Sequence, residues 1–128
     1  MLKKRLGVEA IESSWSFDSI CSYYRIPSTL IIPKDCARIG DWAFANCRNL
    51  KEVVISEGVK EIGLSAFRGC CRDLVKVVIP GSVRIILDEA FCYCYEATII
   101  LGKPESEFKY IGKDAFFSCN DVKEETRN

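Results

Sequence analysis

The chain has 128 residues and a mass of 14.5 kDa, which fits a single domain. Eighteen Lys and Arg balance eighteen Asp and Glu, and this zero net charge argues against nucleic acid or an anionic membrane as the partner. The absence of histidine excludes His-dependent triads and most catalytic zinc sites, whereas eight cysteines are unusually many for this length.

The N-terminal segment is basic but has no apolar run. Met1 to Gly7 contains three basic residues, yet Glu9 and Glu12 follow closely, so the segment lacks the hydrophobic stretch of a secretion signal. The longest apolar runs elsewhere are far too short to cross a bilayer. We therefore expect a chain that is neither exported nor embedded in a membrane, and that lies in the reducing cytoplasm with free thiols.

Four copies of one pattern organise the rest of the chain. The dipeptide Ala-Phe recurs with its phenylalanines 23, 24 and 25 residues apart. A cysteine stands three residues after each phenylalanine, an isoleucine five residues before it, and a mostly apolar residue eight before it. The columns are Phe44, Phe67, Phe91 and Phe116; Cys47, Cys70, Cys94 and Cys119; Ile39, Ile62, Ile86 and Ile111; and Cys36, Val59, Val83 and Phe108.

Short β-branched segments separate the copies. Residues 30–33, 53–56, 77–80 and 98–101 each predict a strand that ends in a turn. The segment from each isoleucine to its cysteine predicts one or two helical turns. One repeat is then a strand, a turn and a short helix, which can bury its apolar face only by stacking on the next repeat. Residues 102–107 interrupt the fourth copy and predict a loop.

This pattern resembles a leucine-rich repeat of the BspA-like subtype, found in bacterial and protist surface proteins. The resemblance depends on the L-x-x-V-x-I runs that begin at Leu50 and Leu74, and on the Ile-Gly-x-x-Ala-Phe-x-x-Cys segments. It implies an α/β fold, a leucine-rich repeat solenoid of about four to five repeats: a curved stack of short parallel strands with short helical turns on the other face. We expect a degenerate capping repeat in residues 1–25, four repeats in 26–122 and a charged C-terminal tail in 123–128.

The repeat accounts for most of the cysteines. We expect the cysteine column to form a buried ladder of small apolar side chains, joined by Cys21 of the capping repeat, and Cys36 to fill a second core column. Successive ladder members lie one strand layer apart, roughly 5 Å, in a line that cannot surround a metal ion. No cofactor, catalytic base or disulfide between ladder neighbours is expected. Cys71 and Cys92 lie off the ladder and are expected to be the more exposed thiols.

The alternation of side chains along each strand predicts which residues face outward. Stacked, they form an apolar stripe on the concave face beside a polar column that begins at Thr29. A contiguous apolar stripe with a polar rim is typical of a binding surface. Alternatively, the β-branched residues stand there for strand propensity alone. The resemblance adds that the strand face is the usual binding surface of the family. The predicted partner-binding residues are Ile31, Glu52, Val54, Lys76, Val78, Thr98 and Ile100.

The sequence thus favours a non-catalytic protein–protein interaction module that binds a protein partner through its concave strand face. Two alternatives stay open. One is a small stand-alone intracellular inhibitor that blocks a macromolecular enzyme, such as a nuclease or a defence complex. The other is a fragment of a surface adhesin, as the resemblance suggests. Neither nucleic acid nor a membrane is expected as a partner. The thinly capped C-terminal edge predicts either a monomer or an end-to-end homodimer.

Overall fold

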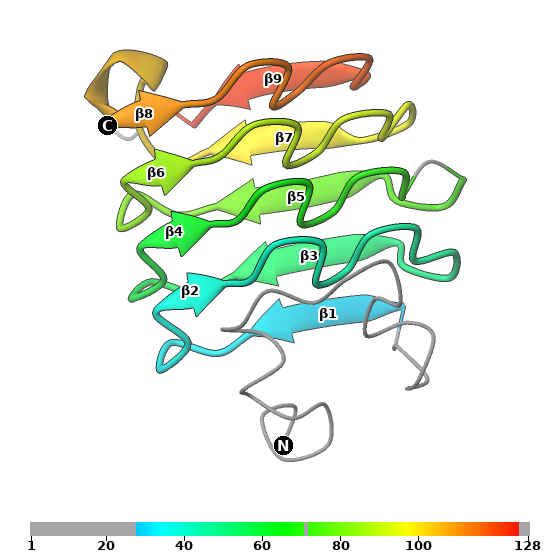
Figure 1. Cartoon of the computed structure of the whole chain (residues 1–128), viewed down its shortest axis with the longest axis horizontal. Helices are drawn as coiled ribbons and strands as arrows, with labels where there is room; N and C mark the ends of the chain where they lie inside the picture. The colour runs from blue at the N-terminus through cyan, green and yellow to red at the C-terminus, as the bar shows by residue number, and fades with distance from the viewer. Residues whose placement is uncertain (1–27, 71, 126–128) are drawn as a thin grey trace.

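The computed structural model describes residues 28–70 and 72–125, which form a parallel-strand solenoid. Figure 1 shows the repeats stacked one above another, with β1 at one end and β8 and β9 at the other. A five-stranded sheet contains β1 (Thr29–Ile32), β3 (Glu52–Ile55), β5 (Lys76–Ile79), β7 (Thr98–Leu101) and β9 (Asp121–Glu124). A four-stranded sheet contains β2 (Arg38–Ile39), β4 (Glu61–Ile62), β6 (Ile85–Ile86) and β8 (Tyr110–Ile111).

The four predicted strands correspond to β1, β3, β5 and β7 of the five-stranded sheet. Their inward side chains are at most 2% exposed and their outward ones are at least partly exposed, because successive residues of a strand point to opposite sides. Each strand pairs in parallel with the equivalent strand of the next repeat. The inward residues of the first four strands are Leu30 and Ile32, Val53 and Ile55, Val77 and Ile79, and Ile99 and Leu101.

The four-stranded sheet was not predicted. Each of its strands has two residues, and the second is the isoleucine that stands five residues before the repeat phenylalanine. Ile39, Ile62 and Ile86 are fully buried. A two-residue strand is too short to show an alternating pattern, so the isoleucine column indicated burial without indicating a second sheet.

A ladder of phenylalanine rings runs through the core between the two walls. The rings of Phe44 and Phe67 stack with centroids 5.2 Å apart, those of Phe67 and Phe91 at 5.1 Å, and those of Phe91 and Phe116 at 6.0 Å. The first three rings are fully buried. The ring spacing follows the spacing of strands within a sheet, so the ladder and the two sheets share one register.

The predicted helical turns are not confirmed, because the segments that carry the phenylalanines are turns. No α-helix occurs in residues 28–70 or 72–125. In every repeat, the residues two positions before and two positions after the phenylalanine have positive φ, as at Trp42 and Asn46, both at 61°. Left-handed residues interrupt α-helical hydrogen bonding. Alternate N–H groups instead donate to the next repeat, as from Trp42 to the Leu64 carbonyl at 2.9 Å.

The ends and the insertion differ from the expectation in part. The predicted loop at 102–107 includes a 3₁₀ helix, η1 (Glu105–Glu107). Lys123 and Glu124, which we expected in a charged tail, belong to strand β9 and pair with Ile100 and Leu101. Their polar side chains hid a strand in which only Val122 points toward the core. The capping repeat predicted for residues 1–25 lies outside the described residues.

Candidate functional site

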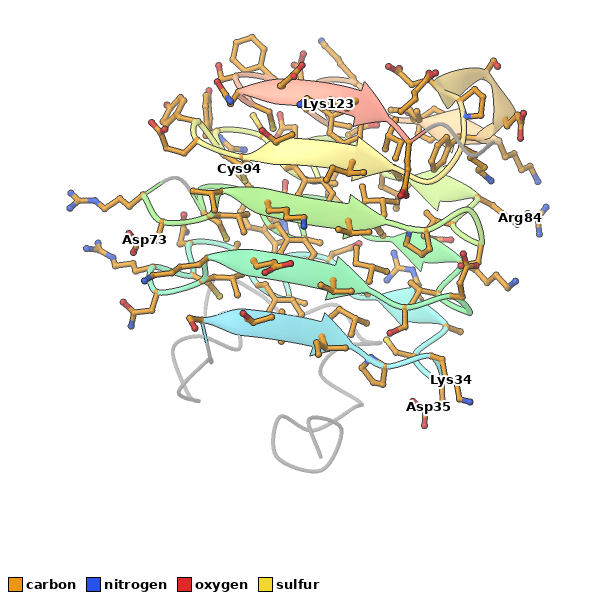
Figure 2. All side chains as sticks on the ribbon, turned by 180° about the vertical axis from the view of Figure 1, so that it is seen from behind. Lys34, Asp35, Asp73, Arg84, Cys94 and Lys123 are labelled. Carbon is orange, nitrogen blue, oxygen red and sulfur yellow. The ribbon has the colours of Figure 1, made fainter. Side chains whose placement is uncertain are left out.

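The outward side chains of the five-stranded sheet, which we name the strand face, lie in straight columns. The parallel register aligns the apolar column Ile31, Val54, Val78 and Ile100, and beside it the polar column Thr29, Glu52, Lys76 and Thr98. Ile31 is 55% exposed, and the other three members of the apolar column are half-buried. The structure therefore brings together the seven predicted partner-binding residues on one surface, which faces the viewer in Figure 2.

Strand β9 extends both columns, which the sequence analysis missed. Asp121 continues the polar column beside Thr98, and Lys123 continues the apolar column beside Ile100. Figure 2 shows Lys123 on the last strand of this face. The apolar column thus ends in a cation, and the whole face spans five strands.

The charges of the strand face are weakly paired. Lys76 Nζ lies 3.9 Å from Glu52 Oε2, and both side chains are at least one-third exposed. An ion pair this long and this exposed contributes little to stability, because water screens both charges. Both groups therefore remain available to a partner.

An open depression of about 550 Å³ lies along one margin of the strand face. Val54 and Val78 supply apolar surface, and the carboxylates of Glu57 and Glu125 are its charged groups. The sequence did not show this depression, because it forms where the ends of strands β3 and β5 meet the turns that follow them. Its further lining residues are Ile55, Ser56, Ile79, Pro80, Gly81 and Gly102.

A second exposed cluster lies on the turn segments. The guanidinium carbon of Arg68 lies 5.9 Å from the centre of the Trp42 ring and 5.1 Å from that of Tyr93. Tyr93 contacts the rings of Tyr95 and Phe117, which are each 51% exposed. Arg68 also forms an ion pair of 2.6 Å with a glutamate of the next repeat. This cluster was not predicted, because its members are spread over four positions of the repeat and do not form a column of like residues.

The geometry and the sequence identify the repeat. Residues 15–126 match the BspA type leucine rich repeat region, in six copies. The chain belongs to the BspA-type leucine-rich repeat family. The six copies exceed the four complete repeats and one degenerate repeat that we counted in the sequence, and strand β9 begins a repeat that this count left out.

One solved structure to which the chain is similar is a leucine rich cell surface protein from Faecalibacterium prausnitzii A2-165. It shares 24% sequence identity with this BspA-type chain, with a TM-score of 0.43. The match covers 90% of this chain and 42% of that protein, so the chain spans less than half of its length. Among curated proteins no sequence matches.

The cysteine ladder of this BspA-type chain has a hydrogen-bonding role. The thiols of Cys70, Cys94 and Cys119 each donate to the carbonyl oxygen of the preceding repeat's phenylalanine, at 3.1 to 3.2 Å. Each phenylalanine carbonyl would otherwise be only partly satisfied inside the core, which is costly. Burial raises the pKa of the Cys119 thiol to about 11, so this group stays protonated at neutral pH. The ladder therefore holds successive repeats together.

The prediction that Cys92 is exposed was wrong. Cys92 is 3% exposed, and burial is the main cause that raises the pKa of its thiol. It directly follows Phe91 in a turn segment, where the chain curves over the core. Cys36 is fully buried, as predicted. Cys71 lies outside the described residues.

Cys47 does not meet the expectation of free thiols, because it is disulfide-bonded. Cys92 and Cys119 are free thiols. Free thiols were expected because the sequence predicts a chain in the reducing cytoplasm, and the disulfide at Cys47 does not fit that expectation. No helix in the described ranges is long and apolar enough to cross a membrane.

Asp88 has structural contacts with the next repeat. Asp88 Oδ1 accepts hydrogen bonds from the Lys113 N–H at 3.1 Å and from the Tyr110 hydroxyl at 2.7 Å. The bond to Asp88 raises the pKa of Tyr110. Residues 28–70 and 72–125 contain no group of three or more Cys, Asp or Glu side chains that could hold a metal ion.

Proposed function

We propose that the chain is a protein-binding module whose strand face contacts the partner. Leucine-rich repeats commonly mediate protein–protein interaction, because a stack of repeats presents a long surface of aligned side chains. The proposed contact residues are the seven predicted from the sequence, with Val54 and Val78 at the centre. Asp121 and Lys123 of β9 extend this surface.

The apolar column carries the proposal. Ile31, Val54, Val78 and Ile100 stand in register on four neighbouring strands, so their exposed surfaces form one stripe. A stripe of this kind with a polar rim matches the anatomy of a protein interface. Strand propensity alone would be served equally by threonine, which the neighbouring column uses at Thr98.

The experiment separates binding from folding. A partner is first captured from the source cell with the wild-type chain, and its affinity is then measured by calorimetry. We expect Val54→Glu with Val78→Glu to weaken binding about 30-fold or more, because charges at the centre of an interface replace its apolar contacts. Val54→Thr with Val78→Thr keeps the strand propensity and should weaken binding to a smaller extent.

The matched control is Leu64→Glu with Tyr95→Glu. These two side chains are 38% and 51% exposed on the turn segments, away from the strand face. This control should bind as the wild type does. All three variants should retain the circular dichroism spectrum of the wild type. Full binding by the folded Val54→Glu/Val78→Glu variant would refute the proposal.

A further inference from the structure

Among the described residues, the hydrophobic core is open at the end of the stack that holds β8 and β9. Four apolar side chains of the last repeat, Ile111, Phe116, Cys119 and Val122, pack against the core but are only partly buried. Their counterparts one repeat earlier, Ile86, Phe91, Cys94 and Ile99, are fully buried. Figure 1 shows β8 of the four-stranded sheet and β9 of the five-stranded sheet at this same end of the stack. The end of the stack is therefore an apolar surface that a further layer would cover.

The edge of β9 is also open within the described part of the chain, where β9 pairs with β7 alone. The Asp121 N–H donates to the carbonyl of Ala97, just before β7, and the Glu125 N–H donates to the carbonyl of Leu101 in β7. Since alternate residues of a strand turn their backbone groups to opposite sides, the N–H of Val122 points away from β7. It donates to the carboxylate of Asp121 at 2.8 Å. An unpaired edge of this kind is a template for another strand.

We propose that this end binds a second copy of the chain, with the two β9 strands antiparallel and centred on Val122. A two-fold axis through Val122 places Asp121 opposite the partner's Lys123, and Lys123 opposite the partner's Asp121. All four side chains lie on the strand face, where directly opposed residues of antiparallel strands are close neighbours. The pairing is thus complementary in charge on both sides of the axis.

Two neighbouring antiparallel registers lack this complementarity. Centring the pair on Lys123 would oppose two lysines, and centring it between Val122 and Lys123 would oppose Asp121 and Glu124. Like charges directly opposite each other are destabilising. In the register on Val122, the backbone N–H of Val122 in each copy donates to the Val122 carbonyl oxygen of the other copy. The Val122 N–H then leaves the Asp121 carboxylate, which becomes free for the partner's Lys123.

The dimer would also close the core. The apolar surfaces of the two last repeats would cover each other, and the two five-stranded sheets would become one continuous sheet. A closed, isologous pair of this kind ends growth at two copies. Because the bond from Val122 to Asp121 must break, we expect an association that is reversible and depends on concentration.

Sedimentation equilibrium on the 128-residue chain tests the proposal. We expect the wild type to shift with concentration toward twice 14.5 kDa. Asp121→Lys and Lys123→Asp each oppose like charges at both positions, so each variant should dimerise at least about tenfold more weakly. The double variant D121K/K123D restores opposite charges and should dimerise at least as tightly as the wild type. An equimolar mixture of the two single variants should form a heterodimer, because the new lysine then faces the new aspartate.

The matched control is Asp73→Lys, which makes the same change of charge at an exposed position before β5, away from the edge of β9, and should leave dimerisation unchanged. A wild-type chain that stays at 14.5 kDa at millimolar concentration would overturn the proposal. So would single variants that dimerise like the wild type, or assemblies larger than a dimer, which indicate head-to-tail stacking. The test needs no other partner, so its failure would leave the proposed function of the strand face standing.

Discussion

Ser65 shows, at the scale of one residue, how the repeat tolerates an unfavourable position. Its φ is 52°, a left-handed conformation that suits glycine better than serine. The residue is 1% exposed, and its hydroxyl has no hydrogen-bond partner among the described residues. Gly69 occupies the other left-handed position of the same repeat. Ser65 therefore carries a conformational cost and a desolvation cost together.

We expect Ser65→Gly to stabilise the protein by about 1 kcal/mol, because it removes both costs and adds only the flexibility of glycine in the unfolded chain. Ser65→Ala should stabilise the protein by a smaller amount, since alanine at this position keeps the strained left-handed backbone. The control is Ala66→Gly, at a neighbouring buried position without positive φ, which should destabilise. Urea unfolding of the three variants measures the differences. A Ser65→Gly protein no more stable than Ser65→Ala would contradict the role of the backbone.

At the scale of the element, aspartate and glycine couple neighbouring repeats. Asp41 Oδ1 accepts the Leu64 N–H at 2.8 Å, so its side chain crosses to the next repeat. A Cβ on Gly63 would lie 2.7 Å from this oxygen and 2.6 Å from the Ile39 carbonyl oxygen. A repeat therefore needs glycine at this position when the preceding repeat supplies the crossing aspartate side chain.

The same rule explains the irregular third copy. Asp88 accepts the Lys113 N–H, and the next repeat has Gly112, whose Cβ would contact Asp88. The second repeat instead has Leu64 at the aspartate position, and the third repeat has Leu87 where the others have glycine. With no aspartate side chain crossing the boundary, leucine can occupy the glycine position.

We expect Gly63→Ala to destabilise the protein by about 1–3 kcal/mol, because the new methyl group meets backbone atoms that cannot move aside cheaply. Gly81→Ala is the control, since the nearest atom to its Cβ would be the Gly102 carbonyl oxygen at 3.7 Å. This change should be neutral or stabilising by up to about 1 kcal/mol. Thermal unfolding measures the stability of both variants. Equal losses of stability in Gly63→Ala and Gly81→Ala would contradict the close contact of Asp41 with Gly63.

Columns of like residues allowed the strands to be predicted, whereas the turns could not be. Residues that recur at one position of a repeat must lie in one line of the stack, so the positions of Val54 and Val78 followed from spacing alone. The left-handed positions hold residue types as different as Trp42, Glu89 and Tyr93. Because none of these types marks positive φ, the same segments looked compatible with a helix. Strand β9 was missed because it has a single apolar residue.

At the scale of the whole molecule, each repeat contacts only its neighbours. Phe67 stacks on both Phe44 and Phe91, whereas Phe116 stacks on Phe91 at one side and is partly exposed at the other. The stability of such a stack is approximately a sum of the repeats and of the interfaces between neighbours. A central repeat contributes two interfaces and the last repeat one, so the same change should act differently at the two places.

We expect Phe67→Ala to lower the free energy of unfolding by about 3–5 kcal/mol, because it leaves a cavity between two stacked rings in the centre of the core. Phe116→Ala should lower the free energy of unfolding by roughly half as much or less, since water already reaches this ring.

Hydrogen exchange distinguishes the two variants by which strands lose protection. Phe116→Ala should raise exchange in β8 and β9 while β1 to β5 stay protected, because an end can open without the rest. Phe67→Ala should raise exchange in all strands together, because a stack broken in the middle leaves two parts that are too short to persist alone. Uniform loss of protection in Phe116→Ala would instead show that the stack unfolds as one unit.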